Sequence, residues 1–308
     1  MPINTLATAT LFQQTLDKVA MHEALTGWME ANAGQVIYNG GAEIKIPKMT
    51  LQGLGKYDRD NGYTKGAITL EYETRKMTQD RGRSFQLDAM DVDETNFVVT
   101  ASTVMGEFQR EYVVPEIDAY RLSKLISTAI AKDKNVVYEY APAEATILRE
   151  IKKGIAAIRG KGYNGELVIH ITPEAKLELE MALAGKITDV TFSVGGIDTT
   201  VPSIDKCPLI ETPQNRMYSA IKILDGKTDG QEKGGYEKGE KAYEANFIIV
   251  PRVTPIAVSK QDKMRIFDPE TNQGANAWAM DYRRFHELWT LDNKEDSIYV
   301  NIKDAKSV

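Results

Sequence analysis

The sequence predicts an α+β fold, because strand patterns and helix patterns occupy separate long stretches of the chain. Apolar and polar residues alternate within residues 36–90 and again within 247–302. Apolar residues recur every three or four positions from 95 to 129. Shorter segments of both kinds fill residues 140–246. We therefore expect two long-stranded regions, one long helix and a smaller mixed domain.

The composition of the 308-residue chain is that of an ordinary globular protein, with 42% hydrophobic and 27% charged residues. No run reaches the roughly 18 consecutive apolar residues of a membrane-spanning helix, and the N-terminus lacks the basic and then apolar order of a signal peptide. We therefore expect no membrane segment and synthesis in a cytosol. A formal net charge of −6 argues against tight duplex binding unless basic residues gather on one face. The single cysteine, Cys207, excludes an intramolecular disulfide and a cysteine-cluster metal site.

The first third of the chain predicts an arm followed by a hairpin. Residues 1–35 predict a semi-ordered arm, since their apolar residues keep only a loose helical spacing before Gly34. Residues 36–90 predict a long hairpin with a polar tip, which contains the turn dipeptide Asn61-Gly62. The apolar residues of its strand patterns are Ile37, Ile44, Ile46, Ile68, Leu70, Tyr72, Phe85 and Leu87.

This hairpin is too thin to bury its own apolar residues. Arms of about 15 residues would project on the order of 50 Å, and an isolated two-stranded hairpin is marginally stable in water. We therefore expect the hairpin to rest on a neighbouring copy of the chain. The expected contact residues are Ile44, Ile46, Ile68, Leu70, Tyr72, Arg75, Lys76, Arg81 and Arg83. For the basic residues of this set, a solvated or inter-subunit charge set and a contact with nucleic acid both stay open.

A long amphipathic helix follows the hairpin. Thr95 occupies an N-cap position, and an apolar stripe runs from Phe97 to Tyr112. Pro115 lacks the N–H that would bond to the carbonyl of Glu111, so we expect the helix to kink or restart there and to continue to about Ala129. The acidic residues just before the helix are Asp88, Asp91, Asp93 and Glu94.

The remaining chain predicts a small mixed domain and a return to strands. Pro142 opens a helix that ends at Gly160, and a strand and a second helix then form a β/α unit between 166 and 185. Segment 225–241 is rich in glycine and charge and predicts a surface loop. The apolar stripe expected inside the first helix is Ile147, Ile151, Ile155 and Ile158. Strand patterns follow near 190–194, 199–201, 217–223, 247–250, 256–258, 278–282 and 298–302.

No group of residues in the sequence supports catalysis or cofactor binding. The three histidines, His22, His170 and His286, have no second histidine at the spacing of a metal site, and we expect His170 to be packed or hydrogen-bonded within its strand. Segment 234–241 lacks the Gly-Lys-Ser/Thr ending of a phosphate-binding loop. The acidic cluster before Thr95 is explained by the preference of carboxylates for a helix N-terminus. We predict no catalytic, cofactor-binding or metal-binding residue and no cofactor.

Several segments resemble the major capsid protein of tailed bacteriophages, whose fold is shared with encapsulins. The most telling is YETRKMTQDRGRSFQLD at 72–88, followed by MDVDET at 90–95. The other segments are VMGEF at 104–108, VPEIDAY at 114–120, LDNK at 291–294 and IYV at 298–300. Together these segments resemble the second hairpin strand, the spine helix and the terminal strand pair of that family.

The resemblance covers nearly the whole chain and implies a division into regions. Residues 1–35 would be the N-terminal arm and 36–90 the extended hairpin loop. Residues 91–139 with 247–308 would form the peripheral domain, and 140–246 the axial domain around the capsomer axes. Glycines near positions 40–41, 53, 55 and 66 would let one sequence adopt slightly different hairpin angles, as hexamers and pentamers demand.

The resemblance also implies a function, which is structural and not enzymatic. The chain would be the head subunit that assembles into hexamers and pentamers of an icosahedral virion shell, built in the bacterial cytoplasm around double-stranded DNA held by weak contacts. Since the chain begins directly with the short arm, we expect a separate scaffolding protein, besides a portal protein and in some cases a decoration protein. The shell of an encapsulin-like nanocompartment, or another self-assembling phage structural protein, stays open as the alternative. An enzyme would need convergent titratable groups, which the sequence does not offer.

Overall fold

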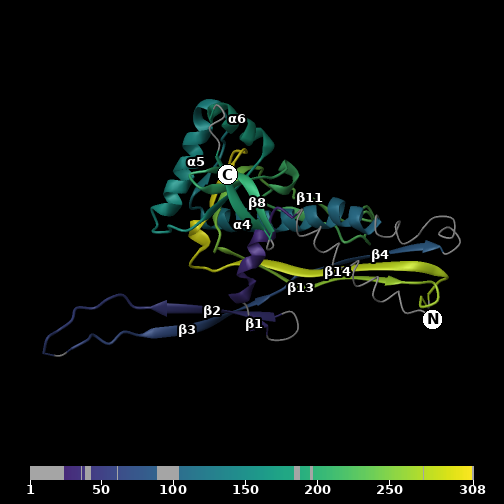
Figure 1. The fold of residues 1–308 in the computed structure, drawn as a ribbon, viewed down its shortest axis with the longest axis horizontal. Coiled ribbons are helices and arrows are strands. Elements are labelled where there is room, and N and C mark those ends of the chain that lie inside the picture. The colour runs from purple at the N-terminus through teal and green to yellow at the C-terminus, as the bar shows by residue number, and fades with distance from the viewer. Residues whose placement is uncertain are drawn as a thin grey trace.

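The computed structural model describes residues 24–35, 37–38, 43–60, 62–88, 104–183, 188–194, 197–272 and 274–306. It confirms the predicted α+β fold. A central body carries two long projections that point in opposite directions, one a thin hairpin and the other a three-stranded sheet (Figure 1). The predicted arm before residue 24, the acidic residues 91–94 and the N-cap Thr95 lie outside the described residues.

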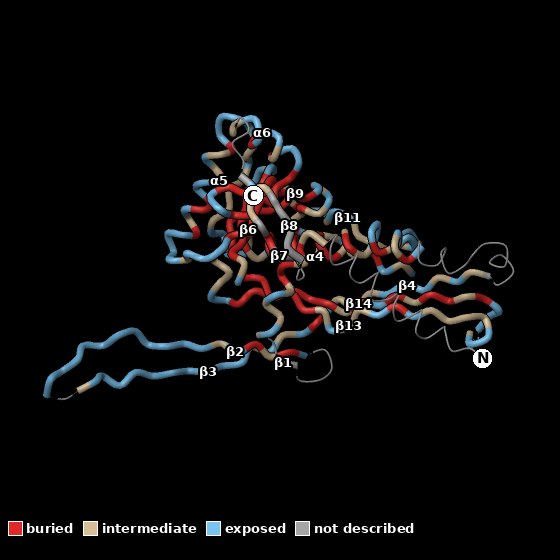
Figure 2. The backbone as a smooth tube through the Cα atoms, in the orientation of Figure 1, coloured by how far each residue is buried: buried red, intermediate tan, exposed pale blue. Residues whose placement is uncertain are grey.

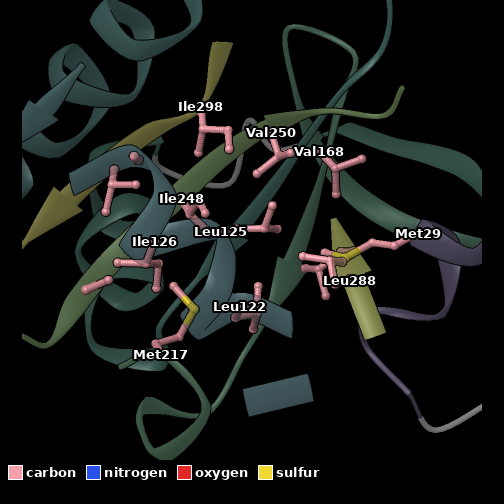
Figure 3. Close-up of a cluster of buried hydrophobic side chains, with 14 of the residues drawn as sticks. Met29, Leu122, Leu125, Ile126, Val168, Met217, Ile248, Val250, Leu288 and Ile298 are labelled. Carbon is pink, nitrogen blue, oxygen red and sulfur yellow. The ribbon is translucent and has the colours of Figure 1, made fainter. Parts of the chain in front are cut away.

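The body is a seven-stranded sheet with helices on both faces. Val168, Ile248 and Val250 pack toward helix α4 (Val114–Lys132), as Figure 3 shows. The residues between them, including Ile169 and Ile249, pack on the other face beneath α5 (Glu144–Arg159) and α6 (Pro173–Leu183). Because successive strand residues face opposite sides, one apolar run serves two cores. In sheet order the strands are β5 (Val136–Val137), β15 (Tyr299–Ile302), β12 (Ala245–Pro251), β6 (Leu167–Ile171), β9 (Cys207–Glu211), β8 (Ile197–Ile204) and β7 (Thr188–Val194).

Helix α5 packs unusually close to the sheet. Its predicted apolar stripe is confirmed, since Ile147, Ile151, Ile155 and Ile158 are all buried. Gly154 is also buried, and a Cβ atom on it would lie 2.7 Å from Ile249 Cδ1 and 2.8 Å from Tyr299 Cδ1. The absence of a side chain at Gly154 therefore sets how near α5 lies to β12 and β15.

We expect Gly154→Val to lower the free energy of unfolding by about 1–3 kcal/mol, because added methyl groups in a filled core force side chains and backbone to shift. The measurement is urea denaturation followed by circular dichroism. Gly53→Val is the control, because nothing lies within 4 Å of a Cβ at Gly53. Equal urea midpoints for Gly154→Val and the unchanged chain would contradict the close packing.

The second projection is a sheet of three antiparallel strands, β13 (Pro255–Phe267), β14 (Ala277–Thr290) and β4 (Gln79–Asp88). We predicted a strand at Phe85 and Leu87 as part of the hairpin. The strand is present, but it pairs with β14 from Gln79 opposite His286 to Asp88 opposite Ala277. Alternation along one strand does not encode which strand lies beside it, and here Phe85 and Leu87 pack with the cluster that contains Met280.

The long helix is continuous across the predicted irregularity. Residues 104–108 are α-helical, and the π-helical segment η2 (Gln109–Val113) joins them to α4. The π segment ends two positions before Pro115, whose missing N–H leaves one carbonyl without its usual helical donor. Asp133, with a φ of 47°, ends α4 in the left-handed conformation.

Several shorter elements complete the chain. Segment 225–241, predicted as a surface loop, contains a short strand that pairs with the segment before it. The remaining elements are η1 (Gly27–Gln35), β1 (Ile37–Tyr38), β2 (Glu43–Leu51), β3 (Ile68–Lys76), η3 (Gln214–Arg216), β10 (Ile221–Ile223), β11 (Tyr236–Lys238) and η4 (Glu295–Ser297). Strands β2 and β3 form the hairpin that projects from the body.

Candidate assembly interface

The β2–β3 hairpin leaves the body and stays exposed along its outer half (Figure 2). Its strands pair from Glu43 opposite Lys76 to Leu51 opposite Ile68. Partners in an antiparallel pair project to the same side, and successive residues project to opposite sides. The hairpin therefore has two chemically distinct faces, which the register assigns residue by residue.

One face of the outer hairpin is apolar. Tyr72 lies opposite Pro47, Leu70 opposite Met49, and Ile68 opposite Leu51. The five large side chains among them are between 51% and 72% exposed. We call this set the hairpin apolar face: Pro47, Met49, Leu51, Ile68, Leu70 and Tyr72. Contiguous exposed apolar surface of this kind marks an interaction site, so the face is the candidate assembly interface.

The opposite face of the outer hairpin is polar. Lys48 lies opposite Glu71, and Thr50 opposite Thr69. Nearer the body, however, this second face carries Ile44 and Ile46, each only 1% exposed. Apolar positions thus change from even to odd numbers at Pro47, and the hairpin presents one face to its own subunit and the other to solvent.

Ile44 and Ile46 therefore need correction as predicted contact residues. Both pack within the chain, in a cluster with Ile256, Val258 and Trp289. Their side chains have no surface left for a neighbour in this conformation, whereas Ile68, Leu70 and Tyr72 do. The sequence carried a signal for this difference, because a strand whose apolar parity changes must bury its two halves against different surfaces.

The tip of the hairpin is a compact turn. Asp58 and Gly62 exchange two backbone hydrogen bonds, with N···O distances of 3.1 and 2.8 Å, and Gly62 has a φ of 79° that suits glycine. The rings of Tyr57 and Tyr63 meet edge to face with centroids 5.0 Å apart. Both rings are more than half exposed, so the tip adds aromatic surface at the far end of the hairpin.

The predicted basic contact residues find acceptors within the chain. Arg75 lies 3.0 Å from Glu73 and 2.9 Å from Asp292, which ties the hairpin to the turn after β14. Lys76 pairs more loosely with Glu43 at 3.7 Å. These two residues sit at the hairpin root and are oriented by their own subunit.

Arg81 and Arg83 lie beyond the hairpin on β4. Arg81 forms a bidentate pair with Glu116 of α4, with N···O distances of 2.7 and 3.1 Å. Arg83 donates both terminal nitrogens to the carbonyl of Glu232, at 3.2 and 3.1 Å. A Cβ on Gly226 would lie 2.9 Å from the Arg83 guanidinium, so a glycine there leaves room for the arginine.

Glu287 of β14 joins the hairpin root to α4. Its carboxylate accepts hydrogen bonds from the Thr78 amide at 3.1 Å, the Thr78 hydroxyl at 2.6 Å and the Lys124 ammonium at 2.7 Å. The Tyr120 hydroxyl also donates to it. Burial alone would raise the pKa of Glu287, but the hydrogen bonds from Lys124, Thr78 and Tyr120 outweigh it and lower the pKa. Thr78 lies between β3 and β4, so this carboxylate fixes the point where the hairpin departs.

Asp118 of α4 fastens the start of the described chain. Its fully buried carboxylate accepts from the amides of Leu25 and Thr26 at 3.1 and 3.0 Å, and from the Thr26 hydroxyl at 2.5 Å. Arg216 donates to the same group at 2.9 Å. One side chain thus connects the N-terminal segment, the long helix and the loop after β9.

His170 is a structural residue of the sheet. The Trp28 indole donates to its Nε2 at 3.2 Å, so the neutral ring carries its proton on Nδ1 and donates to the Thr212 hydroxyl at 3.0 Å. Complete burial lowers the pKa of His170 to about 3. The expectation of a hydrogen-bonded histidine is confirmed.

Within the described ranges, no group of three or more His, Cys, Asp or Glu side chains is placed to hold a metal ion. No helix in that part of the chain is long and apolar enough to cross a membrane. The hairpin apolar face is thus the clearest candidate for a functional surface.

No family model matches the sequence, and no curated protein matches it. Solved structures do match. The bacteriophage PhiM1 mature capsid is 10% identical, with 86% of this chain and 83% of that chain covered and a TM-score of 0.54. The capsid of Ralstonia phage GP4 is 10% identical over 87% and 85%, with a TM-score of 0.54. The capsid of cyanophage P-SCSP1u is 11% identical over 88% and 85%, with a TM-score of 0.52. Over most of its length, this chain has the fold of phage capsid proteins.

Proposed function

We propose that this chain is the major capsid subunit of a tailed bacteriophage, which assembles with copies of itself into hexamers and pentamers of an icosahedral shell around double-stranded DNA. The observation that carries the proposal is the hairpin apolar face. A lone subunit leaves this face in water, whereas a neighbouring copy would cover it, and each copy would repeat the contact around a closed assembly. The likeness in fold to capsid chains supports the proposal from a separate direction.

The contact residues of this proposal are those on the hairpin apolar face. Ile68, Leu70 and Tyr72 remain from the sequence-based set, and Met49 and Leu51 join them because they lie opposite on β2. Arg75, Lys76, Arg81 and Arg83 instead hold the hairpin root and β4 in the orientation that a neighbour meets.

The proposal keeps the division into regions. Residues 1–35 would be the arm, 36–90 the extended loop, 91–139 with 247–308 the peripheral domain, and 140–246 the axial domain, except that β4 (Gln79–Asp88) pairs with β14 and so belongs with β13 and β14. A separate scaffolding protein and a portal protein are the expected partners, with a decoration protein in some cases, and packaged DNA would be held only weakly. The mature location is the virion, and assembly takes place in the host cytoplasm.

Two double variants test the proposal, and each of them places two carboxylates on one face of the hairpin. In Met49→Glu/Leu70→Glu, the charges fall on a cross-strand pair of the apolar face, and desolvating them opposes contact with a neighbour. We expect the concentration needed for half-assembly to rise at least about tenfold, measured by sedimentation velocity and negative-stain microscopy. Thr50→Glu/Thr69→Glu is the matched control, because it adds the same charges to a neighbouring pair on the polar face.

Two outcomes would count against the proposal. If the concentrated, unchanged chain forms no rings or shells in any condition, a capsid role is wrong. If the apolar-face and polar-face variants assemble equally well, the hairpin apolar face is not the contact. Particles isolated from infected or induced cells distinguish the phage shell from a nanocompartment, because the first would enclose double-stranded DNA and the second a cargo protein.

A further inference from the structure

Helices α5 and α6 lie at the end of the body away from the hairpin (Figure 1). They carry two exposed surfaces of opposite charge. Each has an apolar centre with charged residues beside it, and neither is used by the contact proposed above. Their chemistry is complementary, which two unrelated solvent-facing helices would not require.

The first surface is an apolar ridge on α6. Leu177 and Met181 are 58% and 52% exposed. They lie one helical turn apart, so they form one continuous apolar spot. Glu174 and Glu180 flank this spot on either side, since they fall about 60° around the helix from Leu177 in opposite directions. We call these four residues the α6 ridge.

The second surface is a groove of about 1070 Å³ along α5. Small and apolar side chains line it at Ala145, Leu148 and Ala156 of α5 and at Ala182 of α6. Three cations of α5 and one carboxylate, Glu144, lie beside them, so the groove is positively charged on balance. We call this surface, with Arg149, Lys152 and Lys153, the α5 groove. The helix that buries Ile147 and Ile151 on the sheet thus presents small residues and positive charge on its outer side.

Four charged groups of these two surfaces pair with residues of their own chain. Lys152 lies 3.3 Å from Asp205, and Lys153 lies 2.5 Å from Glu150 one turn away. On the ridge, Glu174 lies 2.9 Å from Lys303, and Glu180 lies 3.5 Å from Lys176. Exposed pairs of this kind contribute little to stability, so these groups can change partners when another charged surface approaches.

We infer that the α6 ridge of one subunit binds the α5 groove of a second copy. Leu177 and Met181 would enter the groove above Ala145 and Ala156, while the ridge carboxylates face the groove cations. Because ridge and groove are different patches, each copy can offer its ridge to one neighbour and its groove to another, and this heterologous contact repeats from copy to copy, as a ring requires. A two-fold pair that used both patches at once would stop at dimers. This inference rests on the proposed function, and it names the pair of axial-domain surfaces that would join neighbours within one ring.

Charge reversal tests the inference. Lys152→Glu/Lys153→Glu makes the groove acidic, Glu174→Lys/Glu180→Lys makes the ridge basic, and the fourfold variant reverses both. We expect each single-surface variant to raise the concentration for half-assembly at least about tenfold and the fourfold variant to return it to within about threefold. Lys227→Glu/Lys241→Glu is the control. It changes the net charge by the same amount as the groove variant, but at two exposed positions in loops. Raising the salt concentration from about 0.05 M to about 0.5 M should reduce these differences.

A second measurement does not depend on shell formation. In the doubly substituted Leu177→Cys/Ala156→Cys chain, oxidation should produce a ladder of crosslinked species on a denaturing gel, because each copy offers one thiol to each neighbour. Either single cysteine should stop at dimers. The native Cys207 is buried and does not compete.

The outcomes separate this inference from the capsid proposal. Rescue in the fourfold variant together with a ladder supports it. Single-surface variants that assemble like the Lys227/Lys241 control, or a fourfold variant no better than either parent, overturn the ridge–groove contact while the capsid role stands. An unchanged chain that never forms rings or shells overturns the capsid role; a ladder from the doubly substituted chain would then still support the contact, and a missing ladder would overturn it.

Discussion

Replacing Asp118 with alanine is expected to lower the free energy of unfolding by about 3–5 kcal/mol, because it removes one partner of a buried ionic cluster. The amides of Leu25 and Thr26 and the guanidinium of Arg216 would all lose their acceptor in a buried site. Urea denaturation of the unassembled chain measures the loss. We also expect residues 24–30 to exchange amide hydrogen faster, because they would no longer be tied to α4.

Glu107→Ala is the control for this prediction. It also removes a carboxylate from the long helix, but its partner Arg110 is half exposed, and such a pair contributes at most about 0.5 kcal/mol. Asp118→Ala and Glu107→Ala chains of equal stability would show that the Asp118 cluster does not hold the N-terminal segment in place.

Replacing Glu287 with alanine is expected to cost about 2–4 kcal/mol and to loosen the hairpin root, since the donors from Thr78, Tyr120 and Lys124 would lose their common, fully buried acceptor. Hydrogen exchange should rise at residues 76–79 more than in the seven-stranded sheet. A uniform rise over the whole chain would mean that Glu287 stabilises the fold without controlling the hairpin.

Glu287 also makes the stability depend on pH in a defined direction. Its pKa in the folded chain is lower than its ordinary value of 4.5, so the unfolded chain binds more protons as the pH falls through this range. The stabilisation is complete above about pH 5 and is lost progressively below the ordinary pKa. Thermal melts between pH 7 and pH 3 should therefore show a steeper loss in the unchanged chain than in Glu287→Gln. The buried His286 is present in both chains, so the difference isolates Glu287. Parallel pH curves would contradict this assignment.

Local patterns in the sequence predicted the type of most elements. The isoleucine stripe of α5 has helical spacing, and the alternation at Trp278, Met280 and Tyr282 appears in β14 as expected. Pro115 predicted a kink or restart of the long helix, and the helix instead continues through it, with a π segment just before the proline. The predictions of element type succeeded because backbone geometry repeats over a few residues, so a short stretch of chain contains the whole signal.

The candidate interface was predicted only in part. Ile68, Leu70 and Tyr72 were correctly read as an alternating strand that would find little cover within its own subunit. Ile44 and Ile46 alternate in the same way, but the parity change at Pro47 places them on the opposite face of the hairpin. Following parity along the whole strand, instead of counting apolar residues, would have separated the two sets.

By itself, the sequence determined which segments are helix and strand, and that the hairpin strands carry more apolar surface than the hairpin can bury, because both properties depend on neighbours within a few residues. Only the tertiary structure decided that β4 pairs with β14, that Glu287 holds Thr78, and that Arg75 meets Asp292. Those partners are more than 180 positions apart along the chain, as the residue numbers show. Contacts over such separations depend on how the whole chain packs, and a local pattern of residue types does not specify them.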